Sequence, residues 1–179
     1  MDSLQDLPPW DKDARLQVVV ETPKGSGAKL RYDAASGAFT YQRPLPHRLF
    51  YPYDFGFVPG TLADDGDPLD ALVIHDSATW PGVVIPCRPI ALLKIMDRKR
   101  QEASARQNHR LIAVPAAAPA TNRALSELQR PELEGFFRVV GQQLKEVTIL
   151  GWGNEQEARE EIARTMVNRQ AAPSPSLGA

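Results

Sequence analysis

The sequence predicts a mainly β fold of the α+β class, in which a small barrel carries two C-terminal helices packed outside. Sixteen prolines and twelve glycines divide the 179 residues into short segments, which argues against a bundle of long helices. Short apolar and β-branched segments occupy the first two-thirds of the chain, and two helical patterns follow them. A hydrophobic content of 42% is ordinary for a globular protein.

The expected strands are short runs that end at proline, glycine or a turn sequence. The first run stops at Thr22-Pro23, and the small residues at 34–37 indicate a hairpin between the second and third. Proline and glycine also separate the later runs. The expected strands cover residues 16–21, 29–33, 38–42, 70–74, 83–87, 90–96, 111–114 and 146–150.

Two helices are expected after most of the strands. Within 132–144, apolar side chains recur at helical spacing and share one face: Leu133, Phe136, Phe137, Val140 and Leu144. The second helix is expected to begin at Asn154, because Glu157 stands three residues later and can complete a capping box. Its buried stripe is expected to contain Ala158, Ile162 and Met166.

A single domain is expected at 16–170, with an N-terminal extension at 1–15 and a disordered tail of small residues and prolines at 171–179. The single cysteine, Cys87, excludes an internal disulfide and is expected to be a small buried hydrophobe. A formal net charge of −1 gives no electrostatic case for nucleic acid. No apolar run approaches the roughly 20 residues of a membrane span. We therefore expect a cytoplasmic protein without nucleic-acid or membrane partners.

Four carboxylates, Asp64, Asp65, Asp67 and Asp70, lie within seven residues, immediately before an apolar strand. Like charges this close repel one another unless protonation, full solvation or cations relieve them. Carboxylate oxygens are the ligands that hard divalent ions such as Mg²⁺ select. A solvated acidic turn and a metal site are both consistent with the pattern, and the place of Asp70 at the start of a buried strand favours the metal site.

Residues 65–70 have the sequence DGDPLD, which resembles the signature of the family I soluble inorganic pyrophosphatases. Flanking matches occur at 50–52 (FYP), Gly56, 81–84 (PGVV), 87–89 (CRP) and 151–153 (GWG). The resemblance implies a five-stranded OB-like barrel with helices outside. It also implies hydrolysis of inorganic diphosphate to two phosphates with Mg²⁺ as cofactor, by a protein that forms a homo-oligomer.

The resemblance assigns roles to five acidic residues. Asp65 and Asp70 would ligate the two activating metal ions, and Asp97 would ligate a metal that arrives with the substrate. Asp67 would be the base beside the nucleophilic water. Glu21 would be an active-site acid that supports this network of cations.

Three further residues match family groups that hold phosphoryl oxygens. They are Lys29, Arg43 and Tyr51. Charge-assisted hydrogen bonds to phosphate are about twice as strong as neutral ones, so cations are chemically suited to this task. Inorganic diphosphate is thus the expected ligand.

The chain departs from the family pattern within the expected site. Carboxylates of the family are replaced by Arg31, Arg98 and Asn108, and groups that hold phosphate are absent at Phe55, Val140 and Gly141. The region 97–110 is basic and longer than in the family, and Arg110 is the nearest match to a phosphate-binding lysine. This region is expected to be a solvated loop, or alternatively its arginines supply charge that metals or the lysine provide in the family.

Two functions follow as alternatives. The first is a Mg²⁺-dependent diphosphatase of reduced activity, which the complete set of Asp65, Asp67 and Asp70 favours. The second is a weak or inactive paralogue that binds phosphate or a phosphorylated ligand, or acts as an interaction module. The lost carboxylates favour this second function, since one lost electrostatic contact can cost roughly 10²- to 10³-fold in rate.

Overall fold

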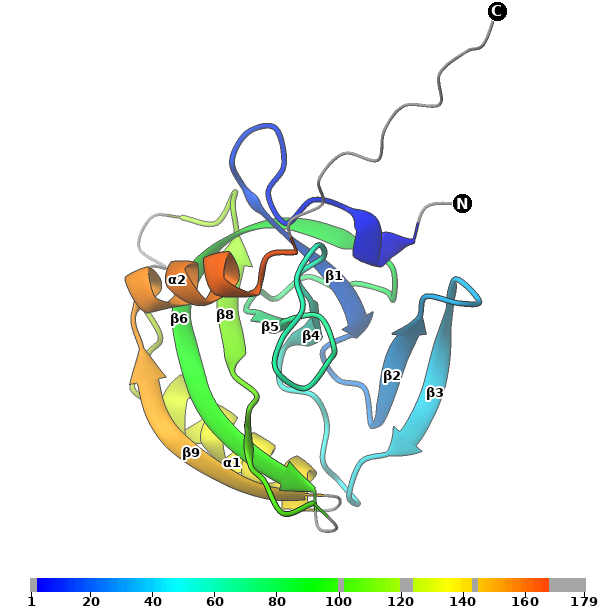
Figure 1. Cartoon of the computed structure of the whole chain (residues 1–179), viewed down its shortest axis with the longest axis vertical. Helices are drawn as coiled ribbons and strands as arrows, with labels where there is room; N and C mark the ends of the chain where they lie inside the picture. Colours follow the sequence, from blue (N-terminus) through cyan, green and yellow to red (C-terminus); the bar gives the residue numbers. More distant parts are fainter. Residues whose placement is uncertain (1–2, 100–101, 120–123, 143–144, 168–179) are drawn as a thin grey trace, which may run out of the picture.

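Five strands pair in a ring. β1 (Leu16–Thr22) pairs antiparallel with β4 (Asp54–Phe57), and β4 pairs antiparallel with β5 (Asp70–Val73). β5 lies parallel to β8 (Arg110–Pro115), which pairs antiparallel with β6 (Val84–Lys99). β6 then returns to β1, so the expected five-stranded OB-like barrel is confirmed (Figure 1). The computed structural model describes residues 3–99, 102–119, 124–142 and 145–167.

Further strands extend the sheet, and a hairpin stands beside it. β7 (Arg106–Gln107) and β9 (Lys145–Gly153) both pair with the second half of β6. β2 (Ala28–Asp33) and β3 (Ala38–Pro44) form a separate two-stranded sheet, which is the expected hairpin. Figure 1 shows this hairpin to one side of the barrel, across from α2 and β9.

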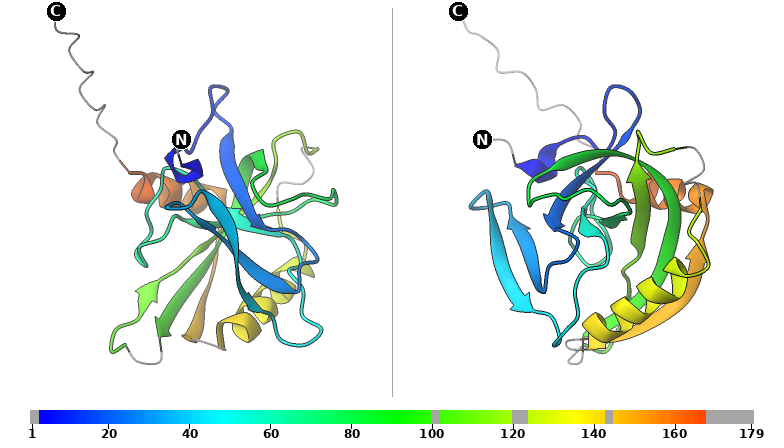
Figure 2. Two further views of the ribbon diagram at one scale, coloured as in Figure 1. Left: turned by 90° about the vertical axis from the view of Figure 1, so that its right-hand side faces the viewer. Right: turned by 180° about the vertical axis from the view of Figure 1, so that it is seen from behind.

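Each helix completes a different core cluster. The helices are α1 (Gln129–Gln142) and α2 (Glu155–Thr165). Side chains alternate in direction along β6 and β8, so Leu93 and Ile112 join one cluster, whereas Leu92 and Leu111 join the other. α1 packs on the first cluster and α2 on the second. Figure 2 shows α1 running along β9 on the outside of the barrel.

Two aspects of the strand prediction are wrong. The separate strands expected at 83–87 and 90–96 are one strand, β6. Its register shifts between Pro89 and Ala91, and a bulge is a place where a residue without an N–H donor is tolerated. The sequence pattern also misses β4, because all four of its residues are buried and polarity does not alternate along it.

The helix predictions are largely correct. α1 begins at Gln129, three residues before the expected start, and Leu144 lies outside the described residues. The capping box of Asn154 and Glu157 is confirmed at the start of α2, and Ala158 and Ile162 are buried. The place of Met166 in the buried stripe is wrong, because the helix ends one residue earlier and Met166 continues in extended conformation, 42% exposed.

The N-terminal segment contacts the barrel through a short 3-10 helix, Leu4–Asp6, whose Leu4 packs near Tyr32 and Phe57. The boundaries of the extension at 1–15 and the domain at 16–170 stay predictions, and the tail at 171–179 lies outside the described residues. Cys87 is buried, as expected, and burial raises the pKa of its thiol. Among the described segments, neither helix has the length and apolar character needed to cross a membrane.

Candidate active site

Two adjoining cavities lie between the barrel, the β2–β3 hairpin and the beginning of β9. The large cavity has a volume of about 420 Å³, and the small cavity has a volume of about 70 Å³. Both are lined by the same charged residues where they meet: Lys29, Arg31, Asp67, Arg110 and Lys145. The cavities are therefore two parts of one highly charged site.

The structure brings together all eight residues that the sequence predicts for the site. Glu21, Asp65 and Asp70 line the small cavity. Arg43, Tyr51 and Asp97 line the large cavity. Lys29 and Asp67 line both. The small cavity thus holds four of the five site carboxylates, and the large cavity contains the residues expected to hold phosphoryl oxygens.

A tight turn between β4 and β5 presents Asp65 and Asp67. Gly66 adopts a φ of +88°, a left-handed conformation that costs glycine little. The Ala63 N–H donates to the Asp67 carbonyl oxygen at 2.8 Å, and the Asp67 N–H donates to Asp65 Oδ1 at 3.2 Å. These bonds hold the two carboxylates on one short loop. Asp70 follows at the first position of β5, on a rigid strand.

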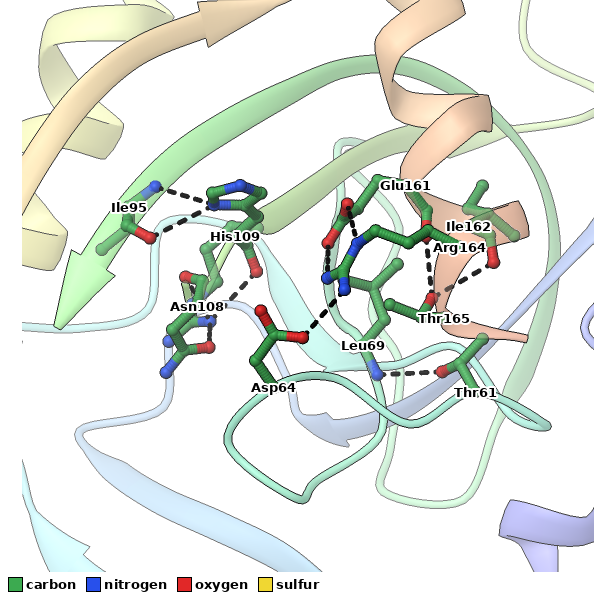
Figure 3. Close-up of polar contacts among 11 residues, drawn as sticks. Thr61, Asp64, Leu69, Ile95, Asn108, His109, Glu161, Ile162, Arg164 and Thr165 are labelled. Atoms are coloured by element: carbon green, nitrogen blue, oxygen red, sulfur yellow. Dashed lines mark hydrogen bonds and ion pairs between the residues drawn. The ribbon is translucent and has the colours of Figure 1, made fainter. Parts of the chain in front are cut away.

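Side-chain contacts on both sides of this turn anchor it to the fold (Figure 3). The hydroxyl of Thr61 accepts a hydrogen bond from the Leu69 N–H at 2.9 Å, which closes the base of the loop. Asp64 accepts from Arg164 of α2 at 2.8 Å, and Glu161 holds the same guanidinium through two hydrogen bonds of 2.9 and 2.7 Å. Asp64 therefore points toward α2 and fastens the loop, and it lines neither cavity.

Three of the site aspartates form ion pairs with cations of the chain. The pairs are Asp67 with Arg31, Asp70 Oδ2 with Arg110 Nη1 at 2.7 Å, and Asp97 Oδ2 with Lys145 Nζ at 2.6 Å. Asn108 also donates from Nδ2 to Asp97 Oδ2 at 2.5 Å. These pairs neutralise carboxylates that would otherwise repel one another at this end of the barrel.

Glu21 is the site carboxylate with the most altered acidity. It is 7% exposed, and burial raises its pKa to about 7, with the nearby Asp70 charge adding to the effect. The Tyr32 N–H donates to Glu21 Oε1 at 2.7 Å and opposes the shift. Its place at the end of β1 fixes this carboxylate at the wall of the small cavity.

Each residue expected to hold phosphoryl oxygens is positioned by burial or by contact with an aromatic ring or a backbone carbonyl. Burial lowers the pKa of Lys29, whose ammonium lies 5.5 Å from the centre of the Phe55 ring. Arg43 Nη2 donates to the Val140 carbonyl oxygen at 3.5 Å. Tyr51 is buried, and burial raises the pKa of its hydroxyl, so that group stays a hydrogen-bond donor at neutral pH.

Known proteins of one family are similar to this chain over most of its length. The family model described as inorganic pyrophosphatase matches residues 18–170. The inorganic pyrophosphatase of Synechocystis is 38% identical over 155 residues, which cover 83% of this chain and 88% of that protein. The enzyme of Thermus thermophilus is 36% identical over 167 residues, which cover 90% of this chain and 95% of that one. The chain belongs to the inorganic pyrophosphatase family. It is therefore an enzyme of the inorganic diphosphatase class, and the resemblance is confirmed.

Solved structures of the family agree with the fold. The crystal structure of the Thermus thermophilus inorganic pyrophosphatase superposes with a TM-score of 0.81 at 34% identity, covering 92% of this chain and 97% of that chain. The inorganic pyrophosphatase of Helicobacter pylori gives a TM-score of 0.78 at 30% identity, covering 89% and 96%.

This family member carries site residues that sequence reasoning missed. Lys145 lines both cavities and pairs with Asp97, and Gln5 reaches the small cavity from the N-terminal segment. Neither belongs to a local motif. The antiparallel pairing of β9 with β6, which sets Val147 opposite Asp97, is the feature that brings Lys145 to the site.

The departures from the family pattern divide into two groups. Arg31, Asn108 and Arg110 line the small cavity, and the two arginines line the large cavity as well. The apolar residues Phe55, Val140 and Gly141 line the large cavity alone. Arg98 lines neither, because it pairs with Glu146. The region 97–110 is partly strand rather than the expected loop, since β6 runs to Lys99 and β7 follows.

The donor chemistry of the small cavity suits a hard divalent cation. Asp65, Asp67 and Asp70 offer carboxylate oxygens, which are the ligands Mg²⁺ prefers. Within the described residues, however, no three acidic, histidine or cysteine side chains are arranged closely enough to enclose a metal ion. The carboxylates of Asp67 and Asp70 are instead held by Arg31 and Arg110. The donor types fit the ion, which would compete with these two guanidinium groups for the carboxylate oxygens.

Proposed function

We propose that the chain hydrolyses inorganic diphosphate to two phosphates in a Mg²⁺-dependent reaction, with Asp67 as the base. The observation that carries the proposal is the junction of a cavity that holds four carboxylates with a cavity in which cations are in excess, at which Asp67 lines both. Oxygen ligands for a hard cation and hydrogen-bond donors for phosphoryl oxygens then lie on either side of Asp67, the proposed base. Membership of the inorganic pyrophosphatase family supports the same reaction.

In this mechanism Asp65, Asp70 and Asp97 hold the metal ions, and Lys29 and Arg43 bind phosphoryl oxygens. Bound Mg²⁺ supplies charge neutralisation and makes water more acidic. Asp67 accepts a proton from the attacking water on a carboxylate oxygen.

The water oxygen forms a bond to one phosphorus as the bond from that phosphorus to the bridging oxygen breaks. The bridging oxygen departs on the second phosphate and takes up a proton as Asp67 gives up the one it accepted, so two phosphates leave and the base is restored. Tyr51 donates a hydrogen bond from its hydroxyl to the phosphoryl group, and Glu21 supports the cations from the wall of the small cavity. We further propose a homo-oligomer in the cytoplasm, with no nucleic-acid or membrane partner, in keeping with the near-neutral net charge of −1.

The alternative function is binding without efficient turnover. The ion pair between Arg31 and Asp67 favours it, because the carboxylate proposed as the base is already engaged by a guanidinium. In this alternative the protein retains phosphate or a phosphorylated ligand in the large cavity.

Release of phosphate from inorganic diphosphate distinguishes the two functions. Purified full-length protein is assayed with Mg²⁺, with Mg²⁺ and excess EDTA, and with no added metal. The proposed function requires turnover that depends on Mg²⁺ and rises in proportion to protein concentration. Saturable binding of diphosphate without phosphate release would establish the alternative.

Asn108 sets the requirement for metal in this proposal. It is buried, its Nδ2 donates to Asp97, and its Oδ1 accepts from Arg110. Asn108→Asp places a second carboxylate against Asp97, which adds a charged oxygen ligand beside the small cavity. We expect the Mg²⁺ concentration for half-maximal rate to fall by about tenfold, because a full charge next to a cation outweighs an amide dipole.

The matched control for Asn108→Asp is Glu102→Ala. Glu102 pairs with Arg106 and lines neither cavity, so its removal should leave the Mg²⁺ dependence unchanged. A damaging Glu102→Ala together with a silent Asn108→Asp would mean that Glu102 supplies the missing carboxylate. The rate is measured as a function of Mg²⁺ at saturating diphosphate.

A further inference from the structure

The large cavity carries an excess of positive charge. Five cations line it, Lys29, Arg31, Arg43, Arg110 and Lys145, against two carboxylates, Asp67 and Asp97. The excess is three formal charges among the lining residues of a concave space of about 420 Å³, and two when Asp70, the partner of Arg110, is counted. A cleft lined by one sign of charge concentrates ions of the opposite sign. An oxyanion with several charges is therefore the class of ligand that this space favours.

The two carboxylates in the large cavity are each neutralised by the chain itself. Lys145 Nζ lies 2.6 Å from Asp97 Oδ2, and Arg31 pairs with Asp67. A divalent cation is the usual means of shielding an incoming phosphoryl anion from aspartates. Here an ammonium and a guanidinium perform that shielding before any ion binds, so the repulsion that an anion meets is already reduced.

Arg110 is a largely buried cation at the place where the two cavities meet. Its side chain is 11% exposed, lines both cavities, and pairs with Asp70 through Nη1. Its Nε is buried and has no hydrogen-bond partner within the described part of the chain. Its Nη1 also donates to the Asn108 and His109 carbonyl oxygens at 3.0 and 3.1 Å, so the guanidinium is fixed in place with its charge at the wall of both cavities.

Lys29 on β2 is a second cation of the cavity whose surroundings favour an anionic ligand. Burial lowers the pKa of its ammonium, which means that the charged form lacks full solvation in the cavity. A phosphoryl oxygen beside Lys29 would replace part of the missing solvation. The cations of the large cavity are thus arranged on several elements: β2, β3, β8 and the start of β9.

We propose that the large cavity binds the diphosphate anion directly on Arg31, Arg110 and Lys145, in addition to Lys29 and Arg43, without requiring a metal ion. The choice of diphosphate rests on the proposed function, whereas binding without metal rests on the charge and ion pairs of the cavity. In this chain the metal ions serve the reaction, and the protein's own cations hold the substrate.

Calorimetric titration of the full-length protein with imidodiphosphate, a diphosphate analogue that resists hydrolysis, tests this inference in excess EDTA. We expect saturable binding, with an affinity within about tenfold of that in Mg²⁺. We also expect Lys145→Met and Arg110→Met to weaken binding in EDTA by about tenfold each. Arg159→Met is the matched control, because Arg159 lies on α2, pairs with Glu155 and lines neither cavity.

The outcomes separate this inference from the proposed function. Binding that occurs in Mg²⁺ but not in EDTA overturns the inference, while hydrolysis in Mg²⁺ would still support the proposed function. Binding in EDTA without hydrolysis in Mg²⁺ supports the inference and removes the proposed function. Equal weakening by Arg110→Met and Arg159→Met would show attraction to overall charge and overturn the inference. Lys145→Arg keeps the charge and should keep the binding, which guards against loss of fold in Lys145→Met.

Discussion

Replacing Asp67 by asparagine is expected to reduce turnover of inorganic diphosphate by about 10²- to 10³-fold while leaving the fold intact. The amide keeps the shape of the carboxylate but cannot accept a proton from water at neutral pH. The side chains of Asp67 and Arg31 are 44% and 48% exposed, and an ion pair with that exposure stabilises a protein by about 0–1 kcal/mol. The substitution should therefore lower the rate of phosphate release strongly and leave the free energy of unfolding almost unchanged.

Asp64→Asn provides the control on the same loop. Asp64 pairs with Arg164 and lines neither cavity, so its amide variant should turn over diphosphate within about twofold of wild type. Turnover is measured at saturating diphosphate and Mg²⁺, with the unfolding midpoint in urea measured for both variants. A rate for Asp67→Asn close to that of wild type would remove Asp67 from the role of base.

Gly56→Ala is expected to destabilise the fold by about 3 kcal/mol or more. A Cβ on Gly56 would lie 1.8 Å from the Val19 carbonyl oxygen and 2.8 Å from its carbonyl carbon. Both are backbone atoms of the neighbouring strand, so relief requires β1 and β4 to separate. Val20 pairs with Gly56 in this register, and Glu21 follows directly, so separation would also disturb the small cavity.

Gly135→Ala is the matched control for this substitution. Gly135 lies within α1, and a Cβ there meets nothing within 4 Å. Alanine favours a helix interior over glycine by about 0.5–1 kcal/mol, so this variant should be slightly more stable than wild type. Urea unfolding of the two variants should therefore shift in opposite directions. Equal shifts would contradict the close approach of β1 and β4.

Local patterns in the sequence were sufficient for most of the fold. The hairpin of β2 and β3 follows from its turn residues, and Asn154 with Glu157 fixes the start of α2. β4 could not be found in this way, because a strand buried on both faces has no alternation and this one contains Asp54 and Gly56. Met166 was misplaced because helical periodicity does not indicate where a helix ends.

The site residues were predictable where a local motif or the resemblance to a known family indicated them. Asp65, Asp67 and Asp70 lie in one loop and strand, so the sequence alone groups them. Lys145 lies 48 residues from its partner Asp97, and their contact depends on strand pairing that no local pattern encodes. The ion pairs of Arg31 and Arg110 depend likewise on the three-dimensional arrangement.

The length of β6 determines which backbone amides become exposed only on global unfolding. This strand pairs with β1, β7, β8 and β9, and Leu92 and Leu93 each have partners on both β8 and β9. Amides enclosed on both sides in this way exchange with deuterium only when the barrel as a whole unfolds, whereas a hairpin at the edge exchanges through local fraying. Deuterium uptake should therefore be slowest at the middle of β6 and much faster in β2 and β3. The pairing of β6 with β9 also holds Asp97 in register near the end of β6, so local opening of the β2–β3 hairpin should leave this carboxylate in place.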